Sequence, residues 1–403
     1  MSVFRRILAS LGVGAQLDAG GRLRVSQLAT QIDLKQINDN QPLQLSRETN
    51  GVGASQAYDK AKGGVLMTVA NAGNYCICQS KQWATYFSGK SHLIEITASN
   101  FQNEQVGTVK RMGYFSSSTS APYDTEFDGV WAEADGTTYR LRISKTGTEI
   151  LNVAKTDWNL YDESGDDWFA PDKFTVLVID FLYLGGTAVR FGFIRNGEIT
   201  WVHKYVHAGE VASTFVASPN QPLRWEIRGG GGASSMDQIC GQVSSEGGRG
   251  EVGVGTSFWQ SDFQADTQGT SYMVQAWRLK EDYRNITIDI TDISVLAETN
   301  DDFRWTVSIN STIAGDALTF VDIDNSALQQ EVGNNTNTTS PANFGKVIAS
   351  GFVQGGTSES SRIKTKITIG TDIDGTSDIA YLHVTPVSNG LDIYSSVTLD
   401  ELL

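Results

Sequence analysis

Three aspartates near the C-terminus have the spacing of an oxygen-ligand loop. Asp372, Asp374 and Asp378 surround Gly375, which permits a sharp turn, and carboxylates in this pattern partly match a Ca²⁺-binding loop. Such a loop has a bidentate glutamate at its twelfth position, where this chain has His383. A plain turn between two strands explains the same residues. The sequence therefore leaves a calcium site and a structural turn as alternatives, and it indicates no other cofactor.

Two tryptophans enclose an acidic loop and are candidates for contact with a carbohydrate. Trp158 and Trp168 flank residues 159–167, which are rich in Asp and Glu. Lectin-like sandwiches bind sugars through exposed aromatic rings together with Asp and Asn side chains. Trp201 is a third candidate. Tryptophans in a sandwich are more often core residues, and the sequence does not distinguish these roles.

The remaining motifs indicate no reaction. His203 and His207 are four residues apart, but in a strand this spacing separates them by roughly 13 Å, too far to share a metal ion. Residues 229–232 are all glycine yet lack the Lys-Ser/Thr of a phosphate loop, and no nucleophile elbow is present. A carboxylate pair for glycoside hydrolysis is recognised only in space. We therefore expect a protein that is not an enzyme.

Residues 173–228 predict the framework that must position these side chains. Residues 174–184 form the longest apolar run and are rich in β-branched and aromatic types, which favours a strand. Residues 189–194 and 199–206 flank Asn196-Gly197, the signature of a type I′ hairpin. The next strand, residues 222–228, alternates between an apolar face of Leu223, Trp225 and Ile227 and a charged face of Arg224, Glu226 and Arg228.

Many such segments at regular spacing, with turn residues between them, predict an all-β protein. The expected fold is an antiparallel β-sandwich of jelly-roll or lectin-like type. We expect an extended N-terminal arm at residues 1–60, the sandwich body at 61–283 and further β-strands at 284–403. The last region either forms a second sandwich or completes the first.

The arm contains a short apolar pattern with helical spacing. Phe4, Ile7, Leu8 and Leu11 fall on one helical face, but the arm has few other apolar residues from which to build a core. A segment of this kind becomes ordered mainly by lying on another surface. It either docks on a partner subunit or wraps its own domain. If it docks, deletion of residues 1–50 should leave a folded body that no longer joins its partners.

Charge and cysteine content exclude some classes of partner. The net charge of −15 argues against a nucleic-acid groove, which needs clustered Lys and Arg. No run approaches the 18 or more apolar residues of a transmembrane helix. The chain has three cysteines, Cys76, Cys78 and Cys240. We interpret them as small buried hydrophobic residues rather than a disulfide framework.

Several spaced blocks resemble a widespread group of tailed-phage virion proteins. The resemblance spans about residues 20–250 and has a weaker echo at 326–330. It is carried by residues 32–43, 89–94, 111–115, 178–185, 189–197, 203–207, 219–227 and 239–248.

This resemblance implies a non-enzymatic structural protein located in the virion, such as a capsid decoration, head fibre or tail-associated protein. It implies contacts with capsid, portal or tail proteins and transfers no catalytic residue. Because virion proteins make symmetric contacts, we expect a homo-oligomer, either a dimer or a trimer. The alternative function is a carbohydrate-binding module that recognises glycans on the host surface.

Overall fold

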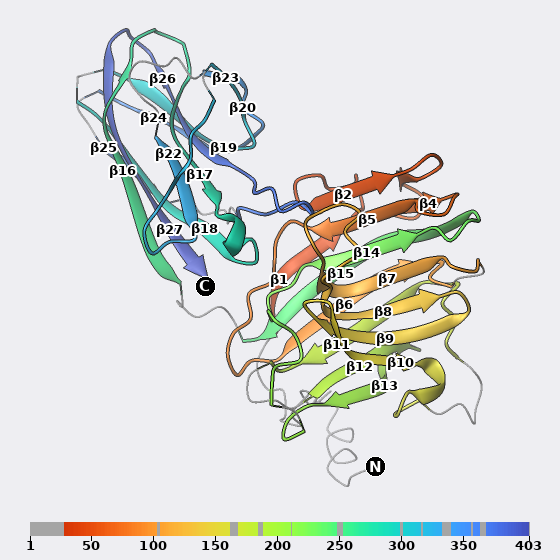
Figure 1. Cartoon of the computed structure of the whole chain (residues 1–403). Helices are drawn as coiled ribbons and strands as arrows, with labels where there is room; N and C mark the ends of the chain where they lie inside the picture. Colours follow the sequence, from red (N-terminus) through yellow and green to blue (C-terminus); the bar gives the residue numbers. More distant parts are fainter. Residues whose placement is uncertain are drawn as a thin grey trace. The chain divides into compact units, whose positions relative to one another are not determined.

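The computed structural model divides the chain into two compact units, Met1–Gly250 and Glu251–Leu403 (Figure 1). The residues it describes are 28–102, 105–161, 168–183, 188–210, 212–247, 253–298, 301–315, 317–332, 340–355, 358–362 and 368–402.

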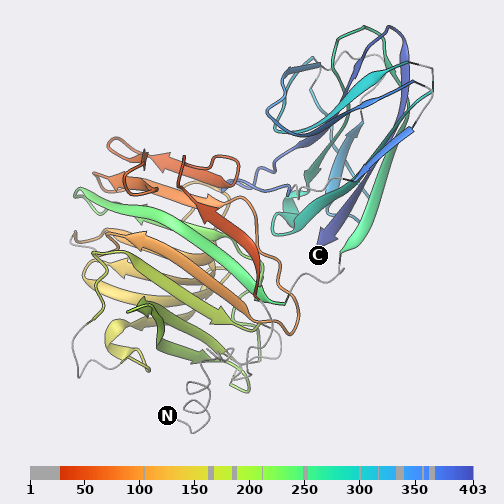
Figure 2. The ribbon, with the colours of Figure 1, turned by 180° about the vertical axis from the view of Figure 1, so that it is seen from behind.

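The first unit is a sandwich of two antiparallel sheets, which we name sheet I and sheet II. Figure 2 gives the view from behind, in which sheet I is nearer the reader. In order, sheet I consists of β13 (Glu198–Val206), β12 (Ala188–Arg195), β11 (Thr175–Phe181), β6 (His92–Ser99), β15 (Ser234–Glu246), β4 (Gly64–Val69) and β3 (Ser55–Asp59), with β1 (Leu28–Lys35) also paired to β15. Sheet II consists of β10 (Thr148–Ala154), β9 (Thr138–Lys145), β8 (Asp128–Asp135), β7 (Val109–Ser116), β14 (Leu223–Arg228), β5 (Tyr75–Ser80) and β2 (Leu45–Asn50). A 3₁₀ turn, η1 (Lys155–Asp157), follows β10.

Alternating side chains of the two sheets form the core of the first unit. Strand β14 buries Leu223, Trp225 and Ile227 against sheet I, as the alternation of its sequence predicts. Strand β11 contributes Leu177 and Ile179 from the other side. The predicted all-β, antiparallel sandwich is thus confirmed.

The hairpin between β12 and β13 also has the predicted geometry. Asn196 and Gly197 both have positive φ, 52° and 81°. These values are what a type I′ turn requires, and they match the twist of the flanking strands.

The second unit has its own sheets and its own core. One sheet consists of β16 (Val254–Ala265), β27 (Leu391–Leu402), β18 (Thr287–Ala297) and β25 (Ser358–Arg362). The other consists of β21 (Val321–Asp322), β22 (Leu328–Val332), β17 (Tyr272–Leu279), β26 (Ala380–Pro386), β19 (Phe303–Ile309) and β24 (Lys346–Val353). A small pair, β20 (Thr312–Ala314) with β23 (Ser340–Asn343), and a 3₁₀ turn, η2 (Glu281–Tyr283), complete the elements. Buried residues of both large sheets, Trp277 and Trp305 among them, form the core.

The division of the chain differs from the expected one. The boundary lies at residue 250, not at 283, and the described part of the expected arm contains strands β1, β2 and β3 of the first sandwich. The pattern of β1 explains the difference. Ile32 and Leu34 are buried while Asp33 and Lys35 are exposed, so a polar-looking segment has one apolar face. Deleting residues 1–50 would remove two strands of the sandwich.

The arm residues Phe4, Ile7, Leu8 and Leu11 lie outside the described residues. Over the ranges that the structure describes, no helix is long and apolar enough to cross a membrane.

Candidate functional site

Strand β15 changes its neighbour halfway along one edge. Its first half, up to Gln238, pairs with β4, whose Val65 lies opposite that residue. From Cys240 onward the same edge pairs with β1, beginning at Lys35. Strands β4 and β1 therefore follow one another along β15, and the change falls at Ile239.

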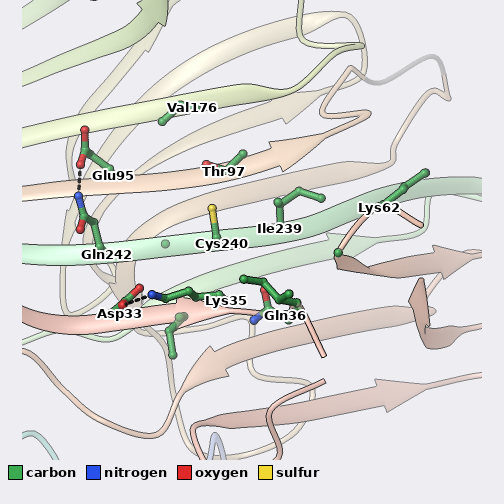
Figure 3. Close-up of a pocket in the computed structure, with 14 residues that line it drawn as sticks. Asp33, Lys35, Gln36, Lys62, Glu95, Thr97, Val176, Ile239, Cys240 and Gln242 are labelled. Atoms are coloured by element: carbon green, nitrogen blue, oxygen red, sulfur yellow. Dashed lines mark hydrogen bonds and ion pairs between the residues drawn. The ribbon is translucent and has the colours of Figure 1, made fainter. Parts of the chain in front are cut away.

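A β-bulge marks the same point on the other edge of β15. The pairing with β6 shifts between Gln238 and Cys240, so that Ile239 is the extra residue. A bulge redirects side chains, because two residues oppose one on the partner strand. Both Ile239 and Cys240 line a groove on the outer face of sheet I, and their side chains stand on the same side of β15 in Figure 3.

This groove, which we call the β15 groove, has a volume of about 570 Å³. Its walls come from β1, the turn before β4, β6, β11 and β15. The lining residues include Asp33, Lys35, Ile37, Lys62, Glu95, Thr97, Val176, Ile239, Cys240 and Gln242.

Four polar side chains of the β15 groove are held in two pairs. Lys35 Nζ lies 2.7 Å from Asp33 Oδ2, and this carboxylate raises the pKa of Lys35. Gln242 Nε2 donates a hydrogen bond to Glu95 Oε2 (Figure 3). These side chains project from β1, β15 and β6 in register, since Gln242 lies opposite Asp33 on one side and Glu95 on the other.

Apolar groups complete the surface of the groove. Val176 on β11 and Ile239 on β15 lie on either side of Thr97 on β6. Phe174 precedes β11 and is 62% exposed.

The second sheet supports the groove from beneath. Trp225 of β14 donates its indole N–H to the carbonyl oxygen of Thr97 at 3.0 Å. At Gly64, a Cβ atom would come within 2.7 Å of the Gln238 carbonyl oxygen. Only glycine at this position lets the start of β4 approach β15 so closely. The groove therefore belongs to the rigid framework of the sandwich.

Trp158 does not lie on the surface. It is 4% exposed and stacks on Phe193, with ring centroids 5.9 Å apart, while Phe169 contacts it edge-on. A ring covered in this way cannot stack on a sugar unless the core opens. Trp158 is therefore a core residue, and its prediction as a glycan contact is wrong. Its position beside an acidic loop in the sequence did not reveal this burial.

The other two tryptophans are half-buried. Trp168 packs against Tyr161, and the guanidinium of Arg195 lies 5.2 Å from its ring centroid. Trp201 carries the guanidinium of Arg190 at 4.3 Å. Neither tryptophan lines the β15 groove.

The three C-terminal aspartates form a turn. Thr371 and Ser377 form a bridge, and Asp374 Oδ1 accepts a hydrogen bond from the N–H of Thr376. The carboxylate of Asp378 is buried and accepts a hydrogen bond from Asn310 Nδ2 at 2.7 Å. Among the residues with a described position, no group of three or more His, Cys, Asp or Glu side chains could hold a metal ion. The geometry fits the structural turn better than the calcium site.

The histidines and cysteines occupy mostly structural positions. His203 Nδ1 accepts a hydrogen bond from the N–H of Asn159, and His207 packs on Phe215. All three cysteines are free thiols, and Cys76 and Cys78 are buried. Cys240 is an exception to the predicted burial, because the bulge turns it toward the groove.

Sequence reasoning identified neither the β15 groove nor strand β1, which it placed in the N-terminal arm. The available signal is alternation: polar residues Asp33 and Lys35 separate buried ones, and Glu95 and Thr97 do the same on β6. Alternation gives the outer face of each strand. It does not give the order in which strands from opposite ends of the unit lie beside one another.

Comparisons with known proteins give similar architectures only. No family model matches the chain, and no curated protein matches it. A β-glucanase of Bacillus licheniformis has 11% identity and a TM-score of 0.36, over 55% of this chain and 100% of that one. The carbohydrate recognition domain of Emp47p has 12% identity and a TM-score of 0.35, over 55% and 98%. A carbohydrate esterase of the Shiga toxin-encoding bacteriophage phi24B has 11% identity and a TM-score of 0.35, over 55% and 100%. At these values the similarities carry no functional inference for this chain.

Proposed function

We propose that the first unit binds a carbohydrate, without cleaving it, in the β15 groove. A sugar presents hydroxyl groups at its edges and C–H groups on its faces, so its site needs oriented polar side chains beside apolar ones. The groove offers Glu95 and Gln242, already oriented by their hydrogen bond, next to Val176 and Ile239. This combination is the observation that carries the proposal.

The dimensions of the groove agree with a small ligand. Its volume of about 570 Å³ lies within the range of about 300–1,000 Å³ that is usual for small-molecule sites. Pre-oriented side chains lose little conformational entropy when a ligand binds, which favours affinity.

A panel of host-surface glycans, tested with the full chain, decides the proposal. We expect at least one glycan to bind, and Gln242→Ala to weaken that binding about ten-fold, because one hydrogen-bonding group and the orientation of Glu95 are lost. Asn152→Ala, an exposed amide on β10 of sheet II, is the matched control. No binding across the panel, or equal binding by the Gln242→Ala variant, would refute the proposal. Appearance of shortened products would refute its non-enzymatic part.

The sequence resemblance favours a second, compatible function. We propose that the protein is a structural component of a tailed-phage virion, attached through its N-terminal residues. Two blocks that carry the resemblance, residues 32–43 and 239–248, both contribute lining residues to the β15 groove. A virion protein with this groove could recognise host glycans.

The attachment is tested by deleting residues 1–27, which leaves every described strand intact. The shortened chain should fold but be absent from purified particles by mass spectrometry, while the full chain is present. Incorporation of the shortened chain at the normal level would contradict attachment through this segment. Light scattering on both forms measures whether the chain is a dimer or a trimer and whether residues 1–27 are needed for assembly.

A further inference from the structure

The charged side chains at the β15 groove are neutralised in pairs, with one exception. Asp33 is paired with Lys35, and Lys62 lies 2.8 Å from Asp237, a buried carboxylate that is not among the lining residues. Glu95 receives only the neutral amide of Gln242. Within the described ranges, no Lys or Arg forms an ion pair with Glu95.

The carboxylate of Glu95 is therefore the charged lining group that has no counter-charge paired to it among the described residues. Gln242 occupies one of its oxygens, Oε2, while Oε1 has no hydrogen-bond partner among the described residues. A fixed carboxylate oxygen accepts hydrogen bonds from hydroxyl groups, which sugars supply. The same oxygen repels a carboxylate, sulfate or phosphate group on a ligand.

The size of this repulsion is enough to discriminate between ligands. Two like charges about 6 Å apart, in a half-exposed groove with an effective dielectric constant between those of protein and water, change an equilibrium constant about ten-fold. Salt screens the effect because the groove is open to solvent. Discrimination should therefore decrease as the ionic strength rises.

We propose that the β15 groove selects uncharged saccharides over acidic ones, and that Glu95 is the residue that determines this selectivity. The inference rests on the proposed carbohydrate binding and adds the class of ligand. Gln242 is a positioning residue, because it holds the Glu95 carboxylate in one orientation through a hydrogen bond.

The test uses two oligosaccharides of identical linkage that differ only in one sugar, glucose in one and glucuronate in the other. The wild-type chain should bind the neutral ligand about ten-fold more tightly at low salt, and the difference should shrink in 0.5 M NaCl. Glu95→Gln should remove most of the difference between the two affinities, because the side chain then no longer repels the glucuronate carboxylate. Glu149→Gln, a half-exposed glutamate of sheet II that pairs with Arg142, should leave the difference unchanged.

Alkylation of Cys240 reports occupancy of the groove independently of affinity. The other two cysteines are buried, so a thiol reagent at low concentration should react mainly with Cys240. Because Cys240 lines the groove, a bound ligand should slow this alkylation. Equal affinity for the neutral and the acidic oligosaccharide would refute the proposed selectivity but not carbohydrate binding. The same holds if the neutral oligosaccharide is preferred but neither salt nor Glu95→Gln changes that preference. Absence of binding and of Cys240 protection with either ligand overturns both.

Discussion

The indole of Trp225 in sheet II lies against Gly241 in sheet I. A Cβ atom at Gly241 would come within 3.2 Å of Trp225 Cη2 and 3.0 Å of Leu223 Cδ1. Both contacts are tighter than ordinary packing. The missing side chain of Gly241 thus sets the spacing of the two sheets directly behind the β15 groove.

Gly241→Ala should therefore destabilise the first unit. Inserting a methyl group into a filled core costs about 1–3 kcal/mol. The expected result is an earlier unfolding transition in urea, followed by tryptophan fluorescence. Gly255→Ala is the matched control, because a Cβ there meets no atom closer than 3.9 Å. Equal stability of the two variants would contradict close packing at Gly241.

Glu226 should be the most sensitive charged residue of the first unit. It is fully buried and lies 2.6 Å from Arg111 and 2.7 Å from Arg224, with Arg228 also paired to it. Glu226→Gln leaves the buried guanidinium of Arg224 without its counter-charge, which costs about 3–5 kcal/mol. The control Glu149→Gln should change the unfolding free energy by less than about 1 kcal/mol, since that side chain is half-exposed.

The same cluster predicts that the stability of the first unit depends on pH. Burial opposes ionisation of Glu226, but Arg224, Arg228 and Arg111 outweigh it and hold its pKa well below the ordinary value of 4.5. Its stabilising contribution is therefore present above pH 4.5 and is lost as the pH falls further. Unfolding free energies measured from pH 6 to 3 should fall less steeply for Glu226→Gln than for the wild type. Parallel curves would contradict this.

His383 should make the second unit sensitive to mild acid. Burial lowers its pKa to about 4, and its Nε2 lies 3.0 and 3.1 Å from the hydroxyls of Ser308 and Ser311. The unfolded chain binds a proton near pH 6.5, so between pH 6.5 and 4 the unfolded state gains protons first. Stability should fall across this window by about 3 kcal/mol in total. His383→Gln should abolish that loss, and an unchanged pH profile would refute it.

Glu401 should anchor the last strand of the second unit. Its buried carboxylate accepts hydrogen bonds from Thr256 Oγ1 at 2.6 Å, Ser326 Oγ at 2.5 Å and the N–H of Ala327 at 2.8 Å. Glu401→Gln weakens three charge-assisted bonds and should cost about 1–3 kcal/mol. Asp400→Asn, next to it on the half-exposed face, should be nearly neutral. Hydrogen exchange of β27 amides measures both.

Local patterns predicted the elements well because strand alternation and turn chemistry act over a few residues. Asn196-Gly197 predicted its hairpin, and the alternation of β14 predicted which of its side chains face the core. The same alternation predicted that Arg224 and Glu226 lie on the opposite face. It did not predict that they are buried there. That burial depends on Ser117 and Tyr123, which hydrogen-bond Arg224 from a distant loop.

The β15 groove could not be predicted for a related reason. It depends on a bulge at Ile239 and on the pairing of Lys35 with Cys240. Neither leaves a local pattern in the sequence. Trp158 illustrates the opposite case: an aromatic residue beside an acidic loop has the same sequence signal whether it is covered or exposed.

The pairing of β1 with β15 also has a consequence for how the protein is made. Leu28 lies opposite Glu246. Strands β1 and β15, which both line the groove, are therefore neighbours in space but are separated in sequence by almost the whole first unit. Contacts so distant in sequence form late in folding, and a chain emerging from the ribosome at about 5–20 residues per second lacks one wall for tens of seconds. Ligand binding at the groove therefore requires that the entire first sandwich has been synthesised and folded. Incomplete chains should be unable to compete for the ligand.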